Sequence, residues 1–389
     1  MKKRIWVVLT SILSGLFLLS CTPKATPTVT PGAKPVSTPA SVLTSNLPSV
    51  RQAQDMPSTS QDADWQKVVE AAKKEGKLTV YSFSFGGDLG LALSQAFKER
   101  YGIQMELVAG SGAVFLERLK VESRSGHPVA DVLEGSATNG ILAKKDGLSQ
   151  SSGTLPALNE TGIWLFDPRV DTENHIVGYS PSLTSPWVNT RQVTPADEPK
   201  SWRDLLDPKW KGKILVTDPD TMPLPTVYYI VFTRYLGLDD EYFRALGKQD
   251  LIITTNQRDN DSKLARGEAP ITWTSNFTSL STMVAEGAPV RPVDMKEGVP
   301  GRTQTLNMVT GSLHPNSARV FLNWLLTPEG QTVNAKLRSY MPLRTDVPDF
   351  TPASVRIKFT KVIPLTPKDE DDNTNALRQR VISKLWGRQ

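Results

Sequence analysis

The chain has 389 residues, of which 39% are hydrophobic and 22% are charged, a composition typical of a soluble globular protein with one large or two medium domains. The formal net charge is only +5, and three of the positive charges belong to Lys2, Lys3 and Arg4. Because no other basic run is present, the sequence lacks the electrostatic pattern of a nucleic-acid-binding protein, and we expect no nucleic-acid partner.

The first residues have the pattern of an export signal, with a basic start followed by an apolar stretch over residues 5–19. Cys21 is the only cysteine, so no disulfide can form within the chain. The sequence Leu-Leu-Ser-Cys at 18–21 resembles the lipobox of bacterial lipoproteins. This resemblance implies a signal peptide over residues 1–20 and acylation of Cys21. The alternative is a free thiol in an uncleaved anchor.

Residues 21–63 are rich in Pro, Thr, Ser and Ala and contain few large apolar side chains. Such a segment buries too little apolar surface to offset its chain entropy. We predict a disordered tether that holds a folded body away from a membrane.

The folded body begins with a predicted helix that Asp64 caps and Gly76 ends. After it the chain repeats the order strand, small-polar turn, helix three times. The predicted strands cover residues 78–83, 103–108 and 129–133, and the turns that follow are 82–87, 109–112 and 134–138. This alternation indicates a parallel sheet with helices on its faces.

The alternation fades near Thr184 and restarts near Ser201, which indicates two α/β lobes with a ligand cleft between them. The second half is predicted to contain strands near 175–180, at 213–217, near 271 and within 288–310. A packed helix is expected over 225–236, one amphipathic helix over 314–337, and a terminal helix near 373–386.

Four long motifs resemble those of one family: WQKVVEAAKKEGKLTVYS, SWRDLLDPKWKGKI with Asp218-Pro219, HPNSARVFLNWLLTPEGQ, and YMPLRTD. They span residues 65–346 and are similar to the extracellular solute-binding proteins of ABC importers, in the ferric-iron-type branch. The resemblance implies a two-lobed type II periplasmic-binding-protein fold (Venus flytrap). Each lobe would be a mostly parallel sheet flanked by helices, joined by a hinge of crossing strands.

The resemblance also implies the function of a binding protein without a reaction of its own. A small ligand would bind between the lobes, and the closed monomer would deliver it to an ABC permease at the extracytoplasmic face of the bacterial cell membrane. The predicted domain bounds are 64–184 for the first part of lobe 1, 185–287 for lobe 2, 288–350 for the return to lobe 1, and 351–389 for C-terminal turns and a helix.

Bare ferric iron prefers anionic oxygen ligands. The iron-binding members are similar to one another in placing two adjacent tyrosines in the second lobe, but here the matching residues are Phe277 and Thr278. Tyr228 and Tyr229 are adjacent inside a predicted helix, where they point about 100° apart and are expected to pack the helix. The three histidines are scattered. We therefore expect no metal and no cofactor, and keep a ferric-iron-binding protein as the alternative.

The turn-to-helix junctions offer backbone N–H groups and hydroxyls at positive helix ends, which suits a small oxyanion or a metal bound together with an anion. The resemblance, rather than any spacing, implies that they converge. For each junction the alternative is local helix capping. A polyamine would instead need carboxylates, for which Asp88 and Glu134 are the candidates. The predicted ligand-binding residues are Ser82, Ser84, Gly86, Ser111, Gly112, Ser136, Thr138, Asp218 and Thr221, with Trp273 as a packing wall and Asn276 as a hydrogen-bonding group.

Two other functions fit a surface-anchored α/β protein. A ligand-sensing receptor would use the same closed form, and the sequence does not separate it from a transport receptor. A surface-anchored hydrolase would need an activated nucleophile, but the Gly-x-Ser-x-Gly motif is absent, and Gly110-Ser111-Gly112 is too short to replace it.

Overall fold

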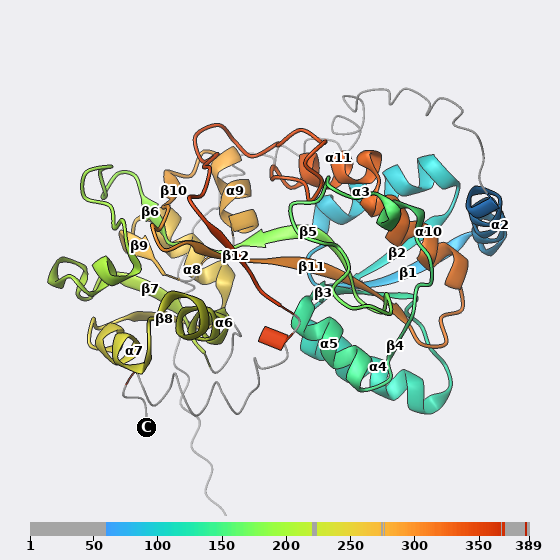
Figure 1. Cartoon of the computed structure of the whole chain (residues 1–389), viewed down its shortest axis with the longest axis horizontal. Helices are drawn as coiled ribbons and strands as arrows, with labels where there is room; N and C mark the ends of the chain where they lie inside the picture. The colour runs from blue at the N-terminus through green and yellow to red at the C-terminus, as the bar shows by residue number, and fades with distance from the viewer. Residues whose placement is uncertain are drawn as a thin grey trace, which may run out of the picture. The chain divides into compact units, whose positions relative to one another are not determined.

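The computed structural model describes residues 60–219, 224–273, 275, 277–366, 368–369 and 386 (Figure 1). The predicted signal peptide, Cys21, nearly all of the predicted tether, and all of the predicted terminal helix except Trp386 lie outside these residues.

The first sheet starts with three parallel strands in the order β3-β1-β2. Helix α2 (Ser60–Glu75) leads into β1 (Lys77–Ser82) and α3 (Gly87–Tyr101). Strand β2 (Gln104–Ala109) is followed by α4 (Gly112–Ser125), and β3 (Val132–Ser136) by α5 (Ala137–Lys145). The threefold strand–turn–helix order predicted from the sequence is confirmed, with bounds that differ by a few residues.

Later segments complete the first sheet, in which β11 (Val299–Val309) and β12 (Val362–Pro364) run opposite to the other strands. The long strand β11 pairs antiparallel with β3, β4 (Ser149–Gln150) and β5 (Val177–Leu183), and parallel with β12. The sheet is therefore mixed rather than mostly parallel. The sequence pattern missed this because β5 and β11 are buried and carry no hairpin or βα signal that reveals their direction.

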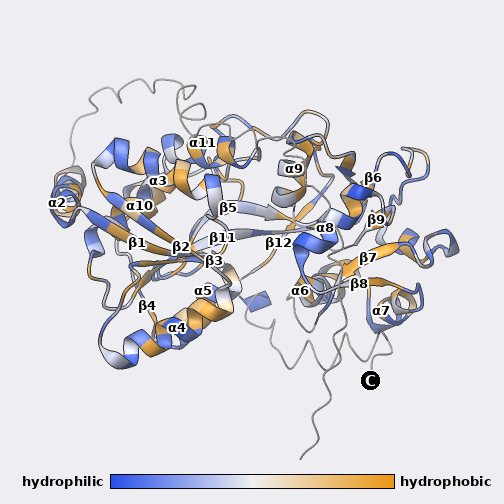
Figure 2. Ribbon diagram, turned by 180° about the vertical axis from the view of Figure 1, so that it is seen from behind, coloured by the Kyte–Doolittle hydropathy of each residue, from blue (hydrophilic) through white to orange (hydrophobic). Residues whose placement is uncertain are grey.

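The second sheet has the order β10-β6-β9-β7-β8 and is also mixed. Strand β7 is parallel to β8 and β9, whereas β6 is antiparallel to β9 and β10. Its core strand β7 is hydrophobic and buried (Figure 2). The strands are β6 (Trp187–Asn189), β7 (Ile214–Thr217), β8 (Ile252–Thr254), β9 (Ile271–Thr272) and β10 (Val290–Pro292), and the helices are α6 (Leu224–Val231), α7 (Asp240–Gly247), α8 (Gln257–Arg266) and α9 (Phe277–Ala285).

The chain first crosses between the sheets at two neighbouring places, and its C-terminal segment later reaches the core of the second sheet again, where Trp386 packs against Trp273. The chain leaves the first sheet after β5 and returns into β11, and these two strands pair antiparallel, with Leu183 opposite Gly301. Two α/β sheets joined by adjacent crossing strands are the architecture expected from the sequence, and the fold class is confirmed.

The amphipathic segment 314–337 forms two helices, α10 (Pro315–Leu326) and α11 (Pro328–Leu337), where one was predicted. Pro328 has no N–H to donate, and it disfavours helical geometry at Thr327 before it. Thr327 is extended instead, and its hydroxyl accepts a hydrogen bond from the N–H of Gly330 at 3.2 Å. The proline therefore ends one helix and starts the next.

Each sheet has a hydrophobic core of its own. In the first, Phe97 of α3 packs against Phe321 and Trp324 of α10, with ring centroids 5.3 and 5.4 Å apart. The core of the second sheet is an aromatic cluster around Trp202 and Phe232, whose ring centroids lie 4.5 Å apart.

Candidate ligand-binding site

The carboxyl ends of β1, β2 and β3 lie side by side, so the turns that follow them meet at one edge of the first sheet. The N–H of Gly110 donates to the carbonyl of Ser82 at 3.0 Å, and the N–H of Phe83 donates to the carbonyl of Glu134 at 3.3 Å. Helices α3, α4 and α5 all begin at this edge. The positive ends of three helix dipoles are therefore gathered in one place.

Two serines cap these helices. The hydroxyl of Ser111 accepts from the N–H of Val114 at 3.4 Å at the start of α4. At the start of α5, the hydroxyl of Ser136 accepts from the N–H of Asn139 at 3.3 Å and donates to its Oδ1 at 2.7 Å. Ser111 is exposed, and Ser136 is partly buried. Capping, the alternative considered from the sequence, is thus present at both serines, and it leaves other donors of the first turns facing the edge.

Gly112 brings the starts of α4 and α5 into contact. A Cβ atom on Gly112 would lie only 2.4 Å from Oδ1 of Asn139. The structure thereby brings together Ser111, Gly112, Ser136 and the buried Thr138, all of which the sequence singled out. Asn139 was missed, because an Asn in the first turn of a helix is usual as a local hydrogen-bonding residue.

The Gly112→Ala variant is expected to lose about 1–3 kcal/mol of unfolding free energy, the usual cost of overpacking, because the side chain of Asn139 must give up the hydrogen bond that its Oδ1 accepts from Ser136. In an Asn139→Ala background the same substitution is expected to cost almost nothing. Urea unfolding of the four proteins of this double-mutant cycle measures the difference. Equal costs in both backgrounds would show that the close approach of Gly112 and Asn139 is not what excludes a side chain here.

Glu134 binds the hydroxyl groups of Ser82 and Ser84. Its Oε2 accepts from the Ser82 hydroxyl at 2.6 Å and from the Ser84 N–H at 2.9 Å. Its Oε1 accepts from the Ser84 hydroxyl at 2.7 Å and from the Tyr179 hydroxyl at 2.8 Å. Glu134 is fully buried, and these four bonds occupy the acceptor sites that a carboxylate has. The two serines predicted to contact a ligand therefore donate to an internal carboxylate.

Arg338, at the end of α11, joins the same network. Its Nη2 donates to the hydroxyls of Ser84 at 2.8 Å and Tyr179 at 3.0 Å, and its Nε donates to Asn334 at 2.8 Å. The guanidinium places a positive charge two hydrogen bonds away from the Glu134 carboxylate. Burial, together with the negative charge of Glu134, holds the pKa of Tyr179 well above its ordinary value, although the positive charge of Arg338 acts to lower it. The Tyr179 hydroxyl therefore remains a donor.

No local sequence signal identifies this network, because its members are distant in the chain. Glu134 was expected in a turn, whereas it lies inside β3 and its carboxylate is buried. Tyr179 and Arg338 were not singled out at all.

Two of the predicted ligand-binding residues, Asp218 and Trp273, belong to the second sheet and its core. Asp218 directly follows β7, and its N–H donates to the carbonyl of Thr254 at 2.8 Å. Trp273 has 0% exposure and packs against Tyr228, with ring centroids 4.7 Å apart. Its ring is thus part of the aromatic core. Thr221 and Asn276 lie outside the described residues.

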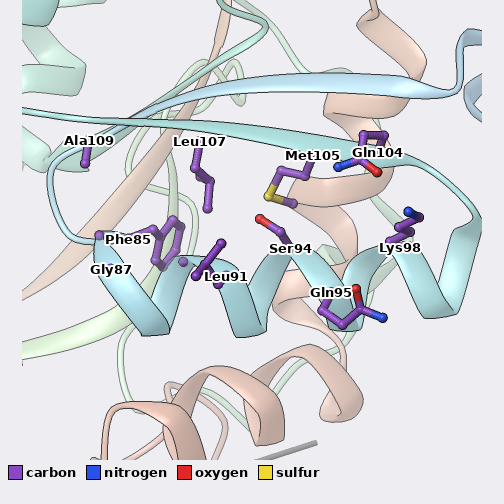
Figure 3. Close-up of a pocket in the computed structure, with 12 residues that line it drawn as sticks. Phe85, Gly87, Leu91, Ser94, Gln95, Lys98, Gln104, Met105, Leu107 and Ala109 are labelled. Carbon is purple, nitrogen blue, oxygen red and sulfur yellow. The ribbon is translucent and has the colours of Figure 1, made fainter. Parts of the chain in front are cut away.

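A surface groove of about 460 Å³ runs between α3 and the edge strand β2 (Figure 3). The side chains of Met105 and Leu107 face Leu91 and Ser94 of the helix across it. Gly86 lines this groove, and no other predicted ligand-binding residue does so among the described residues.

The structure also shows the surroundings of Tyr228 and Tyr229, the adjacent tyrosines considered as iron ligands. Tyr228 is buried in the aromatic core, where burial raises its pKa, while the hydroxyl of Tyr229 donates to Asp240 at 2.7 Å. The two tyrosines therefore have different surroundings. Within the described residues, no three His, Cys, Asp or Glu side chains are grouped so that they could hold a metal ion. The described helices also include none that is long and apolar enough to cross a membrane.

The sequence matches the family model of bacterial extracellular solute-binding proteins over residues 132–361, more than half of the chain. A periplasmic protein of Salmonella typhi, described as 2-aminoethylphosphonate-binding, is 25% identical over 294 residues, which cover 70% of this chain and 80% of the relative. A protein of Sinorhizobium fredii, described as an ABC transporter periplasmic-binding protein, is 25% identical over 315 residues, covering 76% of this chain and 81% of the relative.

Solved structures share the fold. The periplasmic binding protein AfuA from Actinobacillus pleuropneumoniae, with fructose-6-phosphate bound, aligns with a TM-score of 0.65 at 21% identity over 79% of this chain and 97% of that one. Iron-bound HitA from Pseudomonas aeruginosa aligns with a TM-score of 0.65 at 21% identity over 78% of this chain and 99% of that one. These likenesses establish the two-sheet architecture of periplasmic binding proteins for this chain.

Proposed function

Because this chain belongs to the bacterial extracellular solute-binding proteins, which bind a small solute for an ABC transporter, we propose that its solute carries an oxyanion. The oxyanion binds at the edge of the first sheet where α3, α4 and α5 begin, and the facing edge of the second sheet covers it. The chain is a monomer without a catalytic reaction, and an acyl group on Cys21 anchors it at the outer face of the cell membrane.

The observation that carries this proposal is the meeting of three helix starts at one edge of a sheet. Helix N-termini offer unpaired N–H donors and a partial positive charge, which together favour carboxylate, phosphate or phosphonate groups. Hydroxyl groups of Ser111 and Ser136 lie at the same edge. Glu134 does not repel an anionic solute as a free carboxylate would, because four hydrogen-bond donors and the nearby Arg338 compensate its charge.

Two proteins of similar sequence or fold support an oxyanion. The Salmonella typhi relative is described as binding an aminoalkyl phosphonate, and the AfuA structure contains a sugar phosphate. Iron-bound HitA shows that the same fold also holds iron, but the positions that match its family's tyrosine pair are Phe277 and Thr278 here.

The test is a thermal-shift series on the full-length protein purified in detergent, with phosphonates, phosphate esters, carboxylates, polyamines and Fe(III) as separate additions. A ligand that binds only the folded state raises the melting temperature by mass action. We expect a phosphonate, phosphate ester or carboxylate to raise it, and Ser111→Trp, which fills the exposed helix start, to remove the effect. Stabilisation by Fe(III) alone, or by polyamines alone, would contradict the oxyanion proposal.

A further inference from the structure

A buried carboxylate lies near the edge of the second sheet at which β7, β8 and β9 end. Strands β7, β8 and β9 are parallel, so their carboxyl ends share one edge, and α8 begins there directly after β8. Asp261 lies one turn inside α8 and is fully buried. Its Oδ1 accepts from Nε2 of Gln257 at 2.7 Å and from the hydroxyl of Ser275, in the turn after β9, at 3.5 Å.

No described cation offsets the charge of Asp261, and burial raises its pKa, although hydrogen-bonding side chains around it, among them Ser279 and Asn260, act to lower it. Its Oδ2 has no hydrogen-bond partner in the described part of the chain, and no described Lys, Arg or His side chain forms an ion pair with it. Neighbouring Asp259, by contrast, lies 3.9 Å from Nζ of Lys263. Buried charges in proteins are ordinarily paired, since burial without a partner is costly.

The contact between Asp261 and the turn after β9 does not explain why residue 261 is an aspartate. The hydrogen bonds from Gln257 and Ser275 end on Oδ1, and the oxygen of an asparagine would accept them without carrying a charge. The Ser275 contact with Oδ1 is long for a hydroxyl–carboxylate hydrogen bond and is therefore weak. A cationic donor at Oδ2 would satisfy both the free acceptor and the charge.

We propose that Asp261 is the counter-ion for an amine of the bound solute, which makes the solute a zwitterion. Its oxyanion binds at the helix starts of the first sheet and its ammonium group at Asp261. This inference rests on the proposed function and specifies the solute class: small molecules with an amine a few bonds away from a phosphonate, phosphate or carboxylate.

Isosteric ligand pairs test the amine separately from the oxyanion. Titration calorimetry of the full-length protein at pH 8 compares 2-aminoethylphosphonate with propylphosphonate, and β-alanine with butyrate. The wild type is expected to prefer the amine-bearing member of at least one pair by about tenfold or more, a difference that one charged hydrogen bond provides. Asp261→Asn is expected to reduce that preference to within about twofold and to leave the Kd of the amine-free ligand unchanged.

Asp259→Asn is the matched control, because it removes a charge from the same helix and should keep the preference. Folding of Asp261→Asn is checked by its melting temperature. Burial raises the pKa of Asp261 to about 6, so at pH 8 the wild type carries an unfavourable buried charge that the variant lacks. The variant is therefore expected to melt higher than the wild type at pH 8, and the difference should shrink at pH 5, where the carboxyl group is protonated.

The outcomes separate the two proposals. If the wild type binds both members of a pair equally, or if Asp261→Asn keeps the preference, the role of Asp261 is overturned while the oxyanion site stands. If the wild type binds neither these oxyanions nor any other in the thermal-shift series, the proposed function fails, and the role of Asp261 fails with it.

Discussion

The Glu134→Ala variant is expected to lose about 3–5 kcal/mol of unfolding free energy, the cost of removing one side of a buried charged network. Four donors, from Ser82, Ser84 and Tyr179, lose their acceptor together, and Arg338 loses the negative charge that offsets its own. A buried donor left without a partner keeps the cost of its lost hydration. Urea unfolding followed by tryptophan fluorescence measures the change.

Glu117→Ala is the control for this experiment. Glu117 lies on α4, is 74% exposed and contacts Nζ of Lys120 at 2.9 Å. Such a surface pair contributes little, so the control is expected to remain within about 0.5 kcal/mol of the wild type. A loss below about 1 kcal/mol for Glu134→Ala would mean that the network is dispensable, and would return Ser82 and Ser84 to the set of ligand-binding groups.

The second large effect is expected at Trp273, whose replacement by alanine should cost about 3–5 kcal/mol, as for other large buried aromatic residues. Its ring lies within 4.7–6.0 Å of the rings of Tyr228, Phe232, Phe243 and Trp386, measured between centroids. Truncation leaves a cavity that these rigid neighbours cannot close. Trp273→Phe keeps part of the ring contact and is expected to cost less than half as much.

This pair of variants also separates packing from ligand contact at Trp273. A side chain that packs the core changes the unfolding free energy strongly in the absence of any solute. If Trp273→Ala instead weakened solute binding while its unfolding free energy stayed within about 1 kcal/mol of the wild type, the residue would line the binding site as the sequence suggested.

The sequence predicts the first sheet well, because each βα unit carries a local signal. A buried run, a turn of small residues such as Gly86 or Gly110, and a helical repeat of apolar residues follow one another within thirty residues or so. The direction of β5 and β11 has no such signal, since a fully buried strand is apolar whichever way it runs. The direction of these strands is decided only by their pairing with strands more than a hundred residues away in the sequence.

In the candidate site, too, local features could be predicted from the sequence, whereas contacts between distant residues could not. Caps such as Ser111 and Ser136 are local and were found from the sequence. The partners of Ser84 were not, because Glu134, Tyr179 and Arg338 come from three separate elements. A hydroxyl in a turn looks the same in a sequence whether a ligand or a buried carboxylate receives its hydrogen.

The adjacent crossings of β5 and β11 have a consequence for how the chain folds. The whole second sheet is inserted between these strands, so the first sheet remains incomplete until about 115 later residues have been arranged, a long loop whose closure costs entropy. The insert begins and ends at neighbouring strands, with Leu183 opposite Gly301. When the inserted segment folds, it brings these two ends together and removes most of that closure cost, while Ile363 and Trp386 of the C-terminal segment complete its core. Folding of the second sheet thereby places β5 and β11 close enough to pair. Pairing of β11 with β3 and β5 is then a late, non-local step in folding.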